Sequence, residues 1–284
     1  MKLVCFDTET TGLDVQKDHI IQLSLVKFDT GTWCAEEQRD WYILPEGEFS
    51  IPAEAEAVHH ISKPFLESNG VPLKSVYGEL LAFTEGCDML SYNGNGFDAP
   101  ILHYNLKRAG LRFRFEDRTW YDALLLERLH TAGQVDPATG EKVANNLTAA
   151  YTRYYGHAFE GAHNSLDDVL ATIEVFKAQV AAHGWQWAER EEFYFISFDR
   201  WLTRKDGQFC LNQGAHKGES IESLLRSDRT YLDWMITKCK WTDDQTKEII
   251  ASYMDPPAVS VLHPSRGKRR PKGTITDADL CLFD

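Results

Sequence analysis

The sequence lacks the cysteine patterns that build zinc sites and disulfide-stabilised folds. Its six cysteines are scattered at positions 5, 34, 87, 210, 239 and 281, without a CxxC pair or a cysteine–histidine cluster. This spacing argues against a zinc site and against a disulfide framework. We therefore expect buried, reduced thiols.

Long apolar runs are also missing. No stretch approaches the roughly 20 apolar residues of a membrane-spanning helix. Asp7 interrupts the N-terminal segment before the apolar core of a signal peptide can build. These two absences predict a cytoplasmic protein with no membrane contact.

The chain has fewer basic than acidic residues, and its formal net charge is −13 at pH 7. Polyanions are normally bound through Lys and Arg, so this charge lowers the expectation of a nucleic-acid partner without excluding it. A site rich in carboxylates holds divalent cations, which supply positive charge locally. The basic side chains are also unevenly placed, since five of them lie within residues 266–272. That run is either a DNA-contacting patch or a solubilising linker.

The first part of the chain predicts an α/β domain over residues 1–183. Apolar, β-prone segments come first and helical periodicity follows, which favours a layered sheet and helices. We expect the first three strands to form an antiparallel meander. The predicted strands cover residues 2–6, 20–28, 41–44 and 88–92, and the predicted helices cover residues 73–83, 99–109, 121–130, 147–155 and 165–182.

The composition changes after residue 184. Tryptophan is frequent here, and we expect a small α+β module over residues 190–255 with a hairpin turning at Lys205-Asp206-Gly207. Its predicted helices cover residues 220–225, 230–238 and 243–253. Residues 256–284 are rich in Pro, Gly, Lys and Arg, which predicts a flexible tail.

The first candidate site residues are Asp7 and Glu9. Alternate residues of a strand point to the same face, so both carboxylates converge at the end of the first strand. Paired hard oxygen donors suit Mg²⁺ or Mn²⁺. Such pairs are common on solvated surfaces, but here the pair follows a strand that should be buried, where unpaired carboxylates are costly.

Three further candidates stand at predicted element boundaries. Asp98 precedes a helix and on its own would be read as an N-cap. His163 lies in a loop five residues before Asp168, in the first turn of the longest predicted helix. A lone histidine is usually structural, and Asp167 or Asp168 could merely complement the helix dipole.

Taken together, the order Asp-x-Glu, Asp, His-x4-Asp resembles the DEDDh (DnaQ-like) 3′→5′ exonucleases, the family of the proofreading subunit of bacterial replicative polymerase. The resemblance covers nearly the whole first domain. Residues 6–13 look like the first motif of the family, and residues 51–62 are similar to its substrate-binding segment, with His60 where glycine is usual. Residues 92–98 match the second motif, and residues 147–168 the third. The resemblance implies a ribonuclease H-like fold, in which helices flank a mixed central sheet.

The resemblance also implies roles for individual residues. Asp7, Glu9, Asp98 and Asp168 would hold two Mg²⁺ or Mn²⁺ ions roughly 4 Å apart on the scissile phosphate. The spacing from His163 selects Asp168 over Asp167, and His163 would act as general base. Five residues would contact the terminal nucleotide or the strand, namely Thr10, Leu13, His59, Asn93 and Phe97. Loop packing is the alternative for Leu13 and His59, and Asn95 competes with Asn93.

Residues 211–218 and 231–235 look like the small domain that follows the nuclease in exonuclease X-type proteins. Gly214-Ala215 replaces part of the usual pattern and removes a cation. An accessory nucleic-acid contact through His216, Lys217 and exposed aromatics is one interpretation. The other is that Trp201 and Trp234 form the core of a small domain.

The chain ends in an apolar peptide, with Leu280, Leu282 and Phe283 after a polar tail. It resembles the peptides by which bacterial DNA-processing enzymes dock on the sliding clamp. A partner groove could bury side chains that a disordered tail cannot bury by itself. Packing back on its own domain is the alternative.

We expect an exonuclease that acts in DNA repair on DNA 3′ ends, preferring single-stranded ends, and releases 5′-mononucleotides. Two alternative functions, an RNA exonuclease of the same family and the proofreading subunit, would use the same candidate catalytic residues. A non-catalytic adaptor that recruits the clamp is a third alternative, and the intact residue set speaks against it.

Overall fold

The computed structural model describes residues 1–188 and 197–255, which divide into two compact units. Residues 1–188 form the first unit and residues 197–255 the second. The predicted tail 256–284, with its basic run and with Leu280, Leu282 and Phe283, lies outside the described residues.

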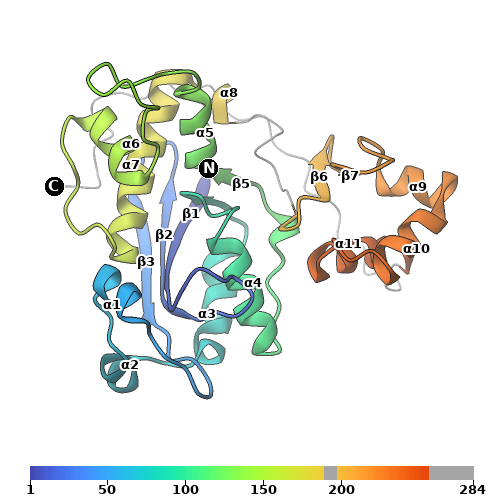
Figure 1. Ribbon diagram of the computed structural model, residues 1–284, viewed down its shortest axis with the longest axis horizontal. Helices are drawn as coiled ribbons and strands as arrows, with labels where there is room; N and C mark the ends of the chain where they lie inside the picture. The colour runs from blue at the N-terminus through green and yellow to red at the C-terminus, as the bar shows by residue number, and fades with distance from the viewer. Residues whose placement is uncertain (189–196, 256–284) are drawn as a thin grey trace. The chain divides into compact units, whose positions relative to one another are not determined.

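The first unit is an α/β domain, as the sequence predicts (Figure 1). Its strands are β1 (Lys2–Thr10), β2 (Ile20–Asp29), β3 (Ala35–Tyr42), β4 (Asp88–Ser91) and β5 (Trp120–Asp122). Its helices are α1 (Ala53–His59), α2 (Lys63–Asn69), α3 (Leu73–Thr84), α4 (Asp98–Arg108), the 3₁₀ helix η1 (Phe115–Asp117), α5 (Ala123–His130), α6 (Leu147–Tyr155), α7 (Ser165–His183) and α8 (Trp185–Ala188).

The five strands form one mixed sheet in the order β3-β2-β1-β4-β5. β1, β2 and β3 pair antiparallel, which confirms the predicted meander. β4 and β5 run parallel to β1. Figure 1 shows α7 lying across the sheet, and the expected fold class, a mixed sheet flanked by helices, is confirmed.

The two faces of β1 have different neighbours because side chains alternate along a strand. Leu3 and Cys5 are fully buried in the main core cluster, together with apolar residues of α7. The same alternation puts Asp7 and Glu9 on the face that α7 covers. Thr8 lies between them and points to the other face.

Three elements differ from the sequence prediction. β3 begins at Ala35, six residues earlier than expected, because its acidic first half does not alternate and belongs to an edge strand that pairs on one side only. The short buried strand β5 occupies positions that were assigned to the start of a helix. The helices α1 and α2 were not predicted, since seven residues carry too little periodicity.

The second unit contains β6 (Leu202–Lys205), β7 (Gln208–Leu211), α9 (Ile221–Ser227), α10 (Arg229–Thr237) and α11 (Asp244–Met254). The predicted hairpin is confirmed: β6 and β7 pair antiparallel around Asp206 and Gly207, which both have positive φ. Positive φ at both turn residues matches the right-handed twist of the strands. Trp201 is buried in this unit, and Trp234 is half-buried.

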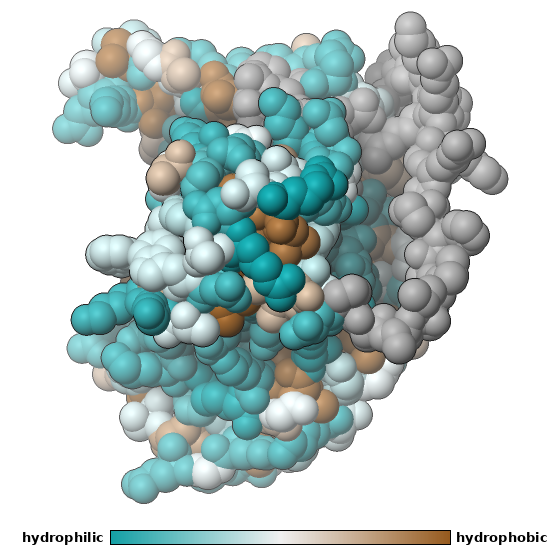
Figure 2. All heavy atoms as spheres, turned by 90° about the vertical axis from the view of Figure 1, so that its right-hand side faces the viewer, coloured by the Kyte–Doolittle hydropathy of each residue, from teal (hydrophilic) through white to brown (hydrophobic). Residues whose placement is uncertain are grey.

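Many of the apolar side chains are buried in the cores of the two units. On the face of the molecule in Figure 2, hydrophilic residues predominate and hydrophobic ones occur in small separate patches. Four cysteines are buried and free, as expected, namely Cys5, Cys87, Cys210 and Cys239. Cys34 is disulfide-bonded, so the expectation of a reduced thiol is wrong there. Among the described residues, no helix combines the length and the apolar character needed to cross a membrane.

Candidate active site

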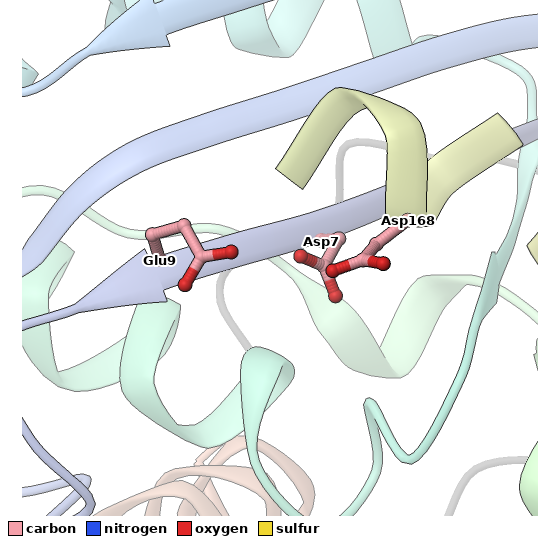
Figure 3. Close-up of side chains that lie close together, drawn as sticks. All are labelled: Asp7, Glu9 and Asp168. Carbon is pink, nitrogen blue, oxygen red and sulfur yellow. The ribbon is translucent and has the colours of Figure 1, made fainter. Parts of the chain in front are cut away.

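Three carboxylates meet where the end of β1 passes under the start of α7. Asp7 and Glu9 come from β1 and Asp168 from α7, and Figure 3 shows the three side chains turned toward one another. One carboxylate oxygen of each lies within 4.8 Å of the others. The three side chains are half-buried, so the cluster is accessible to a small ligand.

The first turn of α7 is capped by local hydrogen bonds and is held on β1 by a long-range one. Asn164 caps the helix, because its Oδ1 accepts hydrogen bonds from the N–H groups of Leu166 and Asp167. The Ser165 hydroxyl donates to the main-chain carbonyl of Asp7 at 2.8 Å. These contacts bring a helix and a strand that are far apart in sequence to a common point.

The protonation of the cluster is strongly perturbed. Burial first, and then the charges of Asp168 and Asp98, raise the pKa of Glu9 to about 8. Burial also raises the pKa of Asp168 to about 7, against a hydrogen bond from the His163 N–H. The pKa of Asp7 lies well above its usual range, because of burial and of the charges of the other carboxylates. A multivalent cation would relieve this repulsion, and hard oxygen donors suit Mg²⁺ or Mn²⁺.

Asp98 approaches from the other face of β1. Its Oδ1 accepts hydrogen bonds from the Thr8 N–H at 3.1 Å and from the Thr8 hydroxyl at 2.6 Å. Burial raises the pKa of Asp98 to about 7, and the Thr8 hydroxyl counteracts it. Asp98 lies outside the three-carboxylate group, yet its charge raises the pKa of Asp7. Phe97 is the N-cap of α4, so the N-cap interpretation of Asp98 is wrong.

His163 is exposed and stands at the end of the segment before α7. Its φ is 71°, and its N–H donates to Asp168 Oδ2 at 3.2 Å. The neighbouring Asp167 is turned away from the cluster: it lines a groove of about 330 Å³ beside α6 and lies against Gly161. The structure therefore brings Asp168, and not Asp167, to Asp7 and Glu9, as the spacing predicts.

Of the residues predicted to contact substrate, Leu13 is 85% exposed. Thr10 is buried, and its hydroxyl donates to the Gly12 carbonyl at 2.8 Å. His59 is buried at the end of α1, and its Nδ1 accepts a hydrogen bond from the Ile61 N–H at 3.0 Å. The proton of neutral His59 therefore lies on Nε2, which is buried and has no hydrogen-bond partner within residues 1–188 and 197–255.

Asn93 is exposed with a φ of 67°, and its N–H donates to Asp122 Oδ1 at 2.9 Å. The same carboxylate accepts the Asn95 N–H at 3.3 Å and caps α5. Phe97 is half-buried. Asp122 was not among the predicted site residues, although an aspartate before a helical run is an N-cap signal. The helix was expected to begin at Tyr121, so Asp122 was placed inside the helix and was not considered as its N-cap.

An exonuclease family profile matches residues 4–176 of the chain. DNA polymerase III subunit epsilon of Treponema pallidum is 26% identical over 184 residues, which are 64% of this chain and 77% of that protein. Three-prime repair exonuclease 1 of Bos taurus is 31% identical over 88 residues, 31% of this chain and 28% of that one.

Among solved structures, E. coli exonuclease I in complex with a dT13 oligonucleotide has a TM-score of 0.59 at 15% identity. The match covers 84% of this chain and 60% of that chain. Its zinc-bound complex with single-stranded DNA has a TM-score of 0.57 at 18% identity, covering 66% and 42%. The chain thus spans less than two thirds of exonuclease I, and this likeness shows a common fold. The family profile covers more than half of the chain, and with the epsilon subunits among the relatives it confirms the resemblance to DnaQ-like exonucleases. The chain belongs to this exonuclease family.

Proposed function

We propose that the chain is a divalent-metal-dependent 3′→5′ exonuclease that releases 5′-mononucleotides from DNA 3′ ends, with a preference for single-stranded ends. The convergence of Asp7, Glu9 and Asp168 within 4.8 Å carries this proposal. Phosphodiester hydrolysis needs such a group, because negative charge must be neutralised around the scissile phosphate.

Asp7, Glu9, Asp98 and Asp168 would hold two Mg²⁺ or Mn²⁺ ions. The donor chemistry fits, since all four groups are carboxylates whose raised pKa values fall when a cation binds. The bound ions would supply Lewis-acid polarisation of the phosphate and neutralise charge on the leaving oxygen. A Mg²⁺ preference is expected, with Mn²⁺ as the alternative.

His163 is the proposed general base. An attacking water forms the new P–O bond, its proton passes to the imidazole of His163, and the bond from phosphorus to the 3′ oxygen breaks. The main-chain hydrogen bond from His163 to Asp168 holds the segment beside the carboxylates, and His163 itself is exposed.

His59 is proposed to donate a hydrogen bond to the terminal nucleotide. Its buried Nε2–H has no hydrogen-bond partner among the described residues, and an unsatisfied buried donor costs about 1–3 kcal/mol. A phosphate or hydroxyl oxygen of the substrate would satisfy it. The exposed Leu13 is suited to wedge against the last base, and Thr10, Asn93 and Phe97 complete the proposed contacts.

A DNA substrate is favoured over RNA by the names of the relatives, which include a polymerase subunit, a repair exonuclease and a single-stranded DNA complex. The same comparison supports the proposed role in repair. An RNA exonuclease or a non-catalytic adaptor would give a different result in single-turnover digestion, whereas a proofreading subunit would shorten DNA in the same way.

Single-turnover digestion tests the proposal. Oligomers of DNA and RNA, labelled at the 5′ end, are incubated with Mg²⁺ and the full chain, and we expect a ladder that shortens the DNA from its 3′ end. Asp7→Ala should abolish the ladder, whereas Asp167→Asn should leave it intact as the matched control. Faster shortening of RNA would show that RNA is the preferred substrate. If neither polymer were cleaved, the exonuclease proposal would be wrong and the non-catalytic adaptor would be favoured.

Three further expectations stay predictions. Residues 190–255 are proposed to be an accessory module, and residues 256–284 a tail that docks on the sliding clamp through Leu280, Leu282 and Phe283. A pull-down with the clamp tests this docking, and equal retention of a Leu282→Ala, Phe283→Ala variant would dispose of it. A cytoplasmic location is proposed from the sequence.

A further inference from the structure

The second unit is nearly neutral, whereas the first is strongly acidic. Residues 1–188 contain 15 Lys or Arg against 27 Asp or Glu, and residues 197–255 contain 9 against 10. A nucleic-acid strand carries a charge on every phosphate and is held mainly by Lys and Arg. Of the two described units, the second is therefore better suited to contact the strand away from the catalytic carboxylates.

Two side chains of this unit, His216 and Trp201, make contacts within the unit. His216 Nδ1 lies 2.8 Å from Glu219 Oε1, and its Nε2 lies 3.3 Å from Asp228 Oδ2. Trp201 is 8% exposed, and a Cβ at Gly214 would come within 2.8 Å of its ring. These contacts assign His216 and Trp201 to the internal structure of the unit.

Trp241 has a different environment. It lies between α10 and α11 and is 71% exposed. Lys238 and Lys240 precede it in the sequence and are both exposed, and no ion pair of either lysine is found in residues 1–188 and 197–255. Asp244 is the exposed acidic residue of this stretch. An exposed indole with two exposed lysines nearby in sequence offers the stacking surface and the positive charge that a base and its neighbouring phosphates need.

The turn that carries Trp241 is held by hydrogen bonds on both sides of the indole. Cys239 is buried, and its N–H donates to the Trp234 carbonyl at 2.9 Å. Thr242 is also buried, and its hydroxyl donates to the Met235 carbonyl at 2.8 Å. The residues on both sides of the exposed indole are thus anchored in the unit. A preorganised aromatic side chain loses little entropy when a ligand stacks on it.

We propose that Trp241, Lys238 and Lys240 form a second contact site for single-stranded DNA, separate from the catalytic carboxylates. One base stacks on the indole of Trp241, and the adjacent phosphates contact the two ammonium groups. This contact reads no base edge, so binding at this site is independent of sequence.

Fluorescence anisotropy of the full chain with a labelled oligothymidylate of about 20 nucleotides, in EDTA to prevent hydrolysis, tests the site. Trp241→Ala should raise Kd about 5- to 160-fold, and Trp241→Phe should restore most of the affinity, because stacking on one aromatic side chain contributes about 1–3 kcal/mol. In a Lys238→Ala, Lys240→Ala variant, the slope of log K against log salt should fall by about 1.4, since each phosphate contact to a single strand contributes about 0.7.

Lys205→Ala is the matched control, because Lys205 is an exposed lysine at the hairpin of the same unit. It should leave Kd and the salt slope unchanged. An unchanged Kd for Trp241→Ala, or an equal effect of Lys205→Ala, overturns the site and leaves Trp241 as a surface for a protein partner. The assay needs no catalysis, so hydrolysis of a dinucleotide with Mg²⁺ tests the proposed function separately.

Discussion

The hydroxyl of Thr8 donates a 2.6 Å hydrogen bond to Oδ1 of Asp98. Thr8 lies between Asp7 and Glu9 on β1 but points to the opposite face, where α4 begins. The strand therefore carries carboxylates on the face covered by α7 and holds a further carboxylate through Thr8 on the other. This bond joins the second motif to the first.

Replacement of Thr8 by valine tests this link. Thr8→Val keeps the shape but removes the hydroxyl, which favours the ionised form of Asp98. A hydrogen bond to a charged group contributes about 1.5–3 kcal/mol, so the Mg²⁺ concentration for half-maximal activity should rise roughly 10-fold or more. Mg²⁺ titration of the initial rate measures this, and Thr8→Ser, which retains the hydroxyl, should behave like the unaltered chain.

The adjacent aspartates of α7 should differ sharply in function. Asp168→Asn removes a carboxylate from the three-residue group and should lower kcat by at least about 100-fold. Asp167→Asn changes a side chain on the groove beside α6 and should stay within about 3-fold of the unaltered chain. Single-turnover rates at saturating Mg²⁺ measure both. Equal losses would show that the spacing from His163 does not identify the ligand.

The metal-free protein should lose stability as the pH rises. The folded-state pKa values of Glu9 (about 8) and Asp168 (about 7) exceed their unfolded values, so ionisation favours the unfolded chain. The loss begins near the unfolded pKa of a carboxyl group, about 4 to 4.5, and is complete above about pH 8. Thermal unfolding in EDTA between about pH 5 and pH 8 measures it.

Glu9→Gln should flatten this dependence and raise the Tm of the metal-free protein at about pH 8. Mg²⁺ should raise the Tm of the unaltered chain more at about pH 8 than at about pH 5, because protons and cations compete for the same oxygens. A metal-free Tm that rises from about pH 5 to about pH 8 would contradict the assigned pKa shifts.

Gly161→Ala should impair the proton transfer that is proposed for His163. Gly161 has a φ of 81°, and an added Cβ would lie 2.3 Å from Asp167 Oδ2. The segment that ends in His163 must then shift, and a misplacement of about 1 Å can lower kcat roughly 100-fold. Gly156→Ala has the same unfavourable φ but no neighbour within 4 Å, so it controls for backbone strain. Asp167→Ala should partly rescue Gly161→Ala, and the absence of rescue would place the defect elsewhere.

Asp243→Asn should stabilise the second unit above about pH 6. Burial and the neighbouring Asp199 raise the pKa of Asp243 to about 6, so its ionised form favours unfolding as the pH rises from about 4 to 6. Asparagine keeps the cap on Thr246 of α11 without the charge. We expect a Tm increase of about 2–4 °C at about pH 7.5. Asp244→Asn, at an exposed neighbour, should change the Tm by less.

Sequence reasoning predicted most of the elements because their patterns are local. The helix α6 begins and ends where predicted, since Asn146 caps its start and Gly156 adopts a positive φ after its end. The hairpin at Asp206 and Gly207 was predicted for the same reason. The short strand β5 was not, because three residues carry no period and their conformation depends on pairing with β4.

The sequence by itself determined which side chains could form the site, through the order of Asp7, Glu9, Asp98, His163 and Asp168 along the chain. Only the tertiary structure decided how they are arranged. Asp7, Glu9 and Asp168 share one face because α7 packs on the face of β1 that carries the two acids, whereas Thr8 receives Asp98 on the other. The burial that raises their pKa values also arises from packing between segments distant in sequence, and no local pattern encodes it.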